Sequence, residues 1–303
     1  MLTHSPVEIR LKELAALRQY ADSFLLPTNS KKALTGSGNT YSPFKSRGLD
    51  FQEVRVYQPG DDIRQIDWHV TAKYGKPFTK LYTEEKDRTI FFIVDLRSSM
   101  QFATHGDFKS VIAARLAAFT AFVANHQKDK IGYLLLTDKG LISSGPSETG
   151  LLDQFLNALA NPTQIINTSS DFETALHALV QLLPTGSFVF FFSDFHDWEE
   201  KDTSLLVPFS EKNTFLFVSI YDALEEKIPN DTLAFSNGND TLILSAQNKK
   251  ARQKFSSDWK QSQQALQNMA IKYGWGFLPL ITHTDYLALF TRFCFGESYE
   301  HTN

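Results

Sequence analysis

The sequence predicts an α/β protein built on a mostly parallel β-sheet with flanking helices. From residue 89 onward, short apolar runs typical of buried strands alternate with longer stretches of helical periodicity, which is the pattern of strands joined by crossover helices. The runs FFIV and FVFFF are apolar at every position, and strands buried on both faces are typical of parallel sheets.

The elements of this C-terminal part follow from the same reading. The predicted strands are TIFFIVD, IGYLLLTD, SFVFFFSD, TFLFVSIYD and GWGFLPL. The predicted helices span residues 107–126, 149–160, 171–183, 249–273 and 283–295. The segment containing TLILS is a connection between the fourth strand and the long fourth helix.

The N-terminal segment is predicted to be a helix. Ser5 is suited to cap it, Pro6 suits a first helical position, and Glu8 is placed to return the capping hydrogen bond. Apolar residues then recur on one face as far as Phe24, and Pro27 ends the pattern.

A small β-containing arm is predicted next. Residues 28–43 are polar and glycine-rich, which indicates a loop. Residues 49–58 alternate like a strand, Asp61 or Asp62 is suited to cap a short helix, and 78–84 resemble another strand. We therefore expect an N-terminal helix, loop and arm over 1–88 and the large α/β domain over 89–303.

Composition narrows the class of protein. The 303 residues include one cysteine, so an intramolecular disulfide is excluded. No apolar run approaches the roughly 20 residues of a membrane span, and charges interrupt the N-terminal sequence, so we expect a cytoplasmic protein. The net charge of −4 argues against a broad nucleic-acid surface. Charge is uneven, because Lys31 to Arg88 holds 11 basic and 8 acidic residues, and the remainder 19 and 26.

Acidic residues end two of the predicted strands. Asp95 follows IFFIV and Asp194 follows FVFFFS. Because ligands of open parallel sheets gather at the carboxyl ends of the strands, we expect the two carboxylates to meet there. Ser98, Ser99 and the polar residues 167–171 are candidates to join them, and oxygen ligands of this kind suit Mg²⁺.

The motif Asp95-x-x-x-Ser99 resembles the metal-ion-dependent adhesion site of the von Willebrand factor A fold, whose opening motif is Asp-x-Ser-x-Ser. The residues before it carry a more specific signature, which comprises Gly60, Asp61, Arg64, Asp67 and Trp68. This signature, followed by FFIVDLRSSM, resembles the bacterial family known as domain of unknown function 58, over about residues 30 to 295.

The resemblance implies a von Willebrand factor A-like domain that acts without catalysis. It implies a MoxR-type AAA+ ATPase as partner, alongside other von Willebrand-domain proteins, in assembly, maturation or metal insertion. Some relatives carry a membrane hairpin, which this sequence lacks.

Carried over residue by residue, the adhesion site is degenerate. Asp95 and Ser99 match its first aspartate and second serine, Ser170 falls where a threonine is expected, and Asp194 matches the later aspartate. Arg97 replaces the middle serine, and its guanidinium is a permanent cation. We therefore expect Arg97 to bridge Asp95 and Asp194 in place of Mg²⁺, with no resident metal. The alternative is that Arg97 is turned outward, into solvent or onto an acidic group of a partner, and that Mg²⁺ is still bound.

Alternatives remain at three places. Asp95 and Asp194 also suit a Mg²⁺-dependent phosphoryl hydrolase, although glycine-rich phosphate loops and a Gly-x-Ser-x-Gly elbow are missing. His196-Asp197 with the following glutamates reads either as a metallohydrolase cluster or, as we expect, a solvated acidic loop. The signature cluster is either a docking surface or, as we expect, a set of caps with Trp68 buried against the large domain.

Overall fold

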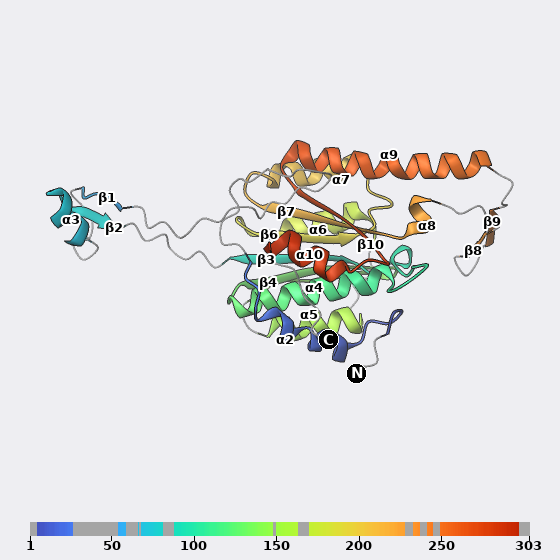
Figure 1. The fold of residues 1–303 in the computed structure, drawn as a ribbon, viewed down its shortest axis with the longest axis horizontal. Helices are drawn as coiled ribbons and strands as arrows, with labels where there is room; N and C mark the ends of the chain where they lie inside the picture. Colours follow the sequence, from blue (N-terminus) through green and yellow to red (C-terminus); the bar gives the residue numbers. More distant parts are fainter. Residues whose placement is uncertain are drawn as a thin grey trace.

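The computed structural model describes residues 5–26, 54–58, 66, 68–80, 88–147, 150–162, 170–227, 233–236, 241–244 and 249–296. A six-stranded sheet in the order β10-β7-β6-β3-β4-β5 forms its centre (Figure 1). Counted along the chain, this is the order 3-2-1-4-5-6 of a doubly wound sheet, read from β5 to β10. The strands are β3 (Thr89–Asp95), β4 (Lys130–Thr137), β5 (Gly140–Ser147), β6 (Phe188–Ser193), β7 (Thr214–Tyr221) and β10 (Gly276–Ile281).

All neighbouring strands of this sheet are parallel except β4 and β5. The expected α/β class with a mostly parallel sheet and flanking helices is confirmed. The edge strand β5 is absent from the sequence prediction. Its sequence GLISSGPS is rich in the glycine, proline and serine of turns, so only its antiparallel pairing with β4 makes it a strand.

Helices cover both faces of the sheet (Figure 1). Residues of three helices share one core with one side of the strands: α4 (Lys109–His126), α5 (Leu151–Ala160) and α10 (Tyr286–Phe295). Residues of another three share the opposite core: α6 (Phe172–Leu182), α7 (Glu200–Leu206) and α9 (Lys249–Tyr273). None of the described helices combines the length and apolarity that crossing a bilayer requires.

Side-chain alternation along β3 divides the core between the two faces. Ile90 and Phe92 face the α4 side, whereas Phe91 and Ile93 face the α6 side. All four are buried, and full burial of each such side chain contributes about 1.5–3 kcal/mol. This burial holds the carboxyl end of β3 in one position, which is where Asp95 lies.

The N-terminal segment packs on the face of the sheet that α4 covers. Its helices are α1 (Leu11–Ala16) and α2 (Arg18–Ala21). The predicted helix start at Ser5 is wrong. The Ser5 hydroxyl accepts a hydrogen bond from the Glu8 N–H, but the chain stays extended at Arg10 and becomes helical only afterwards.

The described part of the arm comprises β1 (Val54–Val56), α3 (Trp68–Tyr74) and β2 (Phe78–Lys80), with β1 and β2 antiparallel. Two further short strands, β8 (Leu233–Ser236) and β9 (Thr241–Leu244), pair antiparallel, and α8 (Ala223–Glu226) follows β7. The division of the chain at residue 88 remains a prediction.

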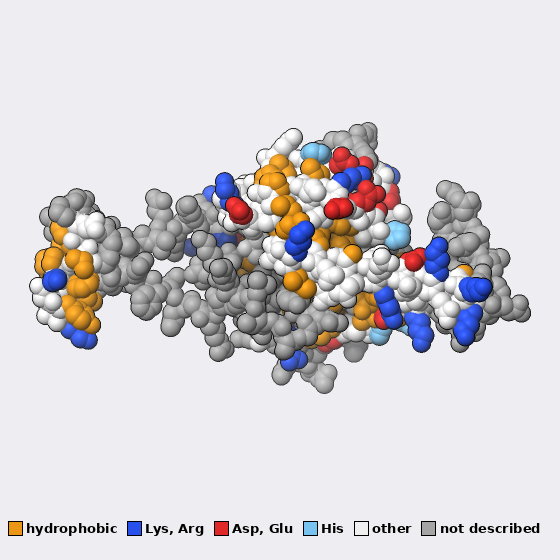
Figure 2. Space-filling view, turned by 90° about the horizontal axis from the view of Figure 1, so that it is seen from above, with side chains coloured by type: hydrophobic (Ala, Val, Ile, Leu, Met, Phe, Trp, Pro, Cys, Tyr) orange, Lys and Arg blue, Asp and Glu red, His pale blue; other side chains and the backbone are white. Residues whose placement is uncertain are grey.

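Trp68 is 67% exposed, so the expected burial of Trp68 against the large domain is wrong. Val56 and Tyr74 on the same unit are also exposed, and hydrophobic side chains gather on its surface (Figure 2). Within the described part of the arm, a helix of seven residues and two strands of three residues enclose too little volume to cover an indole.

This exposure predicts the effect of Trp68→Ala. We expect the free energy of unfolding to change by less than about 1 kcal/mol, because a surface truncation leaves no cavity. A buried tryptophan would lose about 3–5 kcal/mol on the same change. Urea denaturation of the variant and the native protein measures the difference. A loss in the buried range would mean that Trp68 is covered in solution.

Candidate functional site

The candidate site lies at the carboxyl ends of β3 and β6. These strands are neighbours and run parallel, which confirms the expected adjacency of the segments ending at Asp95 and Asp194. The strand that follows β3 in the chain, β4, lies on one side of the β3–β6 pair. The strand that follows β6 in the chain, β7, lies on the other side of this pair. The site therefore occupies the switch point at which doubly wound sheets place their ligands.

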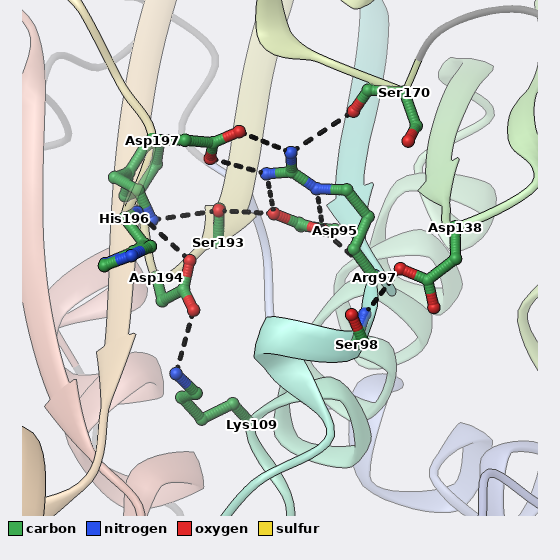
Figure 3. Close-up of polar contacts among 11 residues, drawn as sticks. Asp95, Arg97, Ser98, Lys109, Asp138, Ser170, Ser193, Asp194, His196 and Asp197 are labelled. Atoms are coloured by element: carbon green, nitrogen blue, oxygen red, sulfur yellow. Dashed lines mark hydrogen bonds and ion pairs between the residues drawn. The ribbon is translucent and has the colours of Figure 1, made fainter. Parts of the chain in front are cut away.

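Asp95 and Arg97 form a buried, bidentate ion pair. The carboxylate of Asp95 is fully buried, and the Arg97 Nε and Nη2 donate to its two oxygens at 2.9 and 2.7 Å (Figure 3). The backbone N–H of Arg97 and the hydroxyl of Ser193 donate to the same carboxylate, at 3.1 and 2.8 Å. Burial raises the pKa of Asp95 above its ordinary value, against the opposing effect of Arg97.

The outer edge of the guanidinium is bound by Asp197. Arg97 Nη1 and Nη2 donate to its two oxygens at 2.6 and 2.9 Å (Figure 3). Nη1 also donates to the backbone carbonyl of Ser170 at 3.2 Å, and the guanidinium carbon lies 4.6 Å from the centre of the Phe172 ring. We refer to Asp95, Arg97, Ser193 and Asp197 as the Arg97 cluster.

The expected bridge from Arg97 to Asp194 is therefore wrong in its second partner. Arg97 joins Asp95 to Asp197, while Asp194 has a different cation. The side chains of β6 explain the exchange. Ser193, adjacent to Asp194 in the chain, faces Asp95, so Asp194 is turned toward α4 and Asp197 comes over the guanidinium.

Lys109, the first residue of α4, is the cation that faces Asp194. Its Nζ is buried and donates to Asp194 Oδ2 at 2.8 Å (Figure 3). The same Nζ also pairs with Glu225 of α8. Burial alone would raise the pKa of Asp194, but the charge and hydrogen bond of Lys109 outweigh it and place the pKa below its ordinary value. We refer to Lys109, Asp194 and Glu225 as the Lys109 cluster.

A chain of hydrogen bonds extends the Lys109 cluster across the carboxyl ends of the strands. Glu225 Oε2 accepts from the backbone N–H of Asp222, and Asp222 accepts from the hydroxyls of Thr104 and Thr282. Segments after β3, β6, β7 and β10 are thereby tied together.

The other sequence-predicted site residues contribute less. Ser99 is exposed, and its neighbour Ser98 donates its backbone N–H to Asp138 at 2.9 Å. Ser170 takes part through its backbone carbonyl. Gly60, Asp61, Arg64 and Asp67 lie outside the described residues, and their roles remain predictions.

The arrangement does not fit a divalent ion. Each carboxylate that matches an adhesion-site aspartate already faces a side-chain cation of this chain, and Arg97 stands where a serine ligand would be needed. Within the described ranges, no three His, Cys, Asp or Glu side chains are grouped so that they could hold a metal ion.

Sequence reasoning missed Lys109, Glu225 and the contact of Asp197. Lys109 had a usable signal, because it begins the mostly apolar helix KSVIAARLAAFTAFVANH, and a buried charge requires a partner. Asp197 belongs to the predicted solvated acidic loop, and its side chain is 45% exposed. Its pairing with Arg97, 100 residues away in sequence, has no local sequence signal.

Comparison with known proteins gives a family and distant relatives. The sequence pattern of the family described as "Protein of unknown function DUF58" matches residues 53–265. Uncharacterized protein Mb1516 of Mycobacterium bovis and Uncharacterized protein Rv1480 of Mycobacterium tuberculosis are each 29% identical over 135 residues, or 44% of this chain and 42% of theirs. The chain thus spans less than half the length of these curated relatives.

Among solved structures, the chain is similar to the conserved hypothetical protein BatB from Bacteroides thetaiotaomicron. The sequence identity is 14% and the TM-score is 0.36. The match covers 61% of this chain and 98% of that chain.

Proposed function

The chain belongs to the family of proteins of unknown function DUF58, and from this premise we propose that it is a non-enzymatic partner of an AAA+ ATPase of the MoxR type. The partner class, and a role in assembly, maturation or metal insertion, come from the family resemblance. In this proposal the carboxyl edge of the sheet is a degenerate adhesion site that works without a metal.

The observation that supports this proposal is the pairing of both strand-end carboxylates within the chain. Both oxygens of Asp95 accept hydrogen bonds from Arg97, and Asp194 accepts from Lys109 and from the backbone N–H of His196. A metal-dependent phosphoryl hydrolase needs carboxylate oxygens open to its ion and water. The hydrolase alternative is therefore the weaker one.

The arm provides a surface suited to a protein partner. Val56, Trp68 and Tyr74 are exposed on it, and exposed apolar groups of this kind mark interaction sites. Tryptophan and tyrosine are also the residues that most often dominate binding energy. The segment from Lys31 to Arg88 has an excess of basic residues, which favours an acidic surface on the partner.

Binding to a purified MoxR-type ATPase from the same genome tests the proposal. We expect binding that weakens as salt is raised, because screening reduces attraction between exposed charges. Trp68→Ala should reduce the affinity by about tenfold or more, as truncation of a binding hot spot does. Calorimetric titration at low and high salt measures both effects.

The matched control is Tyr133→Phe on β4, because Tyr133 is buried in the core of the large sheet and is not open to a partner. It should leave the affinity unchanged. Absence of binding at any salt concentration would refute the ATPase partnership. Affinity that does not change with salt would contradict the charge-driven docking of the arm.

A further inference from the structure

Every N–H donor of Arg97's guanidinium is in use. A guanidinium has five such donors. The N–H of Nε and one N–H of Nη2 donate to Asp95. The other N–H of Nη2 and one N–H of Nη1 donate to Asp197. The second N–H of Nη1 donates to the Ser170 carbonyl. Loss of Asp197 alone would leave two parallel donors facing outward.

The two carboxylates on this guanidinium differ in their exposure. The Asp95 side chain is 0% exposed, whereas that of Asp197 is 45% exposed. Asp95, the Ser170 carbonyl and the Phe172 ring hold the guanidinium from the inside. The outer edge is therefore held ready for a carboxylate that arrives from solvent, and such preorganisation lowers the cost of binding.

The backbone that carries Asp197 is held without its carboxylate. The turn begins at Phe195, whose φ of 53° is left-handed, and Trp198 N–H donates to the Phe195 carbonyl at 3.3 Å. The rings of Phe195 and Trp198 both pack on Phe172 and Phe217. Removing the Asp197 carboxylate should leave this turn, and the space that the carboxylate filled, in place.

We infer that the outer edge of Arg97 is a carboxylate-binding seat, occupied within the free chain by Asp197 and taken over by an acidic side chain of a protein partner. This inference rests on the proposed function for the identity of the ligand. The exchange is balanced in charge, because one carboxylate leaves Arg97 as another arrives. Asp197 thus acts as an internal competitor that lowers the affinity of the free protein for acidic groups.

Acetate and the tripeptide acetyl-Gly-Glu-Gly-amide are the probes that test the seat. In Asp197→Ala, we expect both to shift the Nε–H NMR signal of Arg97 saturably. The signal is assigned by its loss in Arg97→Lys. The native protein should bind at least about tenfold more weakly, because Asp197 competes at the high effective concentration of a tethered group. Chloride at equal ionic strength and acetyl-Gly-Gln-Gly-amide should not shift the signal.

Asp138→Ala is the matched control, because Asp138 is an exposed carboxylate at the same edge that binds a backbone N–H instead of the guanidinium. It should behave as the native protein does. Equal shifts in all three proteins, or no saturable shift in Asp197→Ala, would overturn the seat. Binding of acetate without binding of the glutamate peptide would overturn the assignment to a protein ligand. Neither probe involves the ATPase, so failure here is distinct from failure of the proposed partnership.

Discussion

Replacing Arg97 with methionine is expected to lower the free energy of unfolding by about 3–5 kcal/mol at neutral pH, which is the usual cost of leaving a buried charge without its partner. Asp95 would keep only the Ser193 hydroxyl and a backbone N–H as donors, in a site closed to water. Urea denaturation measures the loss. A change of less than about 1 kcal/mol would contradict the buried ion pair.

The same variant is expected to recover stability as the pH falls. Burial already raises the pKa of Asp95 in the native protein, and loss of the guanidinium raises it further. A carboxyl whose pKa is higher in the folded than in the unfolded state stabilises the fold at low pH, and this contribution is lost as the pH rises through the folded pKa. Asp95→Asn in the methionine background should abolish this gain in stability at low pH, while the contributions of other carboxyls such as Asp194 remain.

The effect of Mg²⁺ on the melting temperature distinguishes a site closed by Arg97 from an adhesion site that binds a metal ion. The melting temperature of the native protein should not respond to millimolar Mg²⁺ or EDTA, because Arg97 supplies the charge. Arg97→Ser restores the expected serine ligand, so its melting temperature should rise with Mg²⁺, since an ion that binds only the folded state stabilises it by mass action. A native protein stabilised by Mg²⁺ would restore the metal-binding hypothesis.

Replacing Lys109 with methionine is expected to cost a similar 3–5 kcal/mol or so. Asp194 and Glu225 would then face one another without the cation that both now bind, and Asp194 is almost fully buried. Asp194→Asn should cost less, because Lys109 would still be paired with Glu225.

A double-mutant cycle makes the test specific. Lys109→Met combined with Asp194→Asn should be more stable than Lys109→Met alone, because the buried charge that lost its partner is removed as well. Urea denaturation of the four proteins gives the coupling energy. Additive losses would show that Lys109 and Asp194 do not interact in solution, contrary to the geometry.

The sequence by itself determined the strands of the sheet core and the position of the candidate site. Runs such as IFFIV and FVFFF are apolar throughout and long enough for one strand, and in a parallel sheet they bring their following residues to one edge. The long helix over residues 249–273 was also predicted with its observed bounds, because its period and length leave no other assignment.

Tertiary structure alone decided which basic side chain forms an ion pair with which carboxylate. Local sequence places Arg97 next to Asp95, but not Lys109 beside Asp194 or Asp197 over Arg97, because these pairs join residues 85 and 100 positions apart. The pairing of β5 at the edge of the sheet and the exposure of Trp68 were also decided only by the tertiary structure. Each depends on which neighbouring element supplies hydrogen bonds or cover, and local periodicity carries no information about contacts between distant parts of the chain.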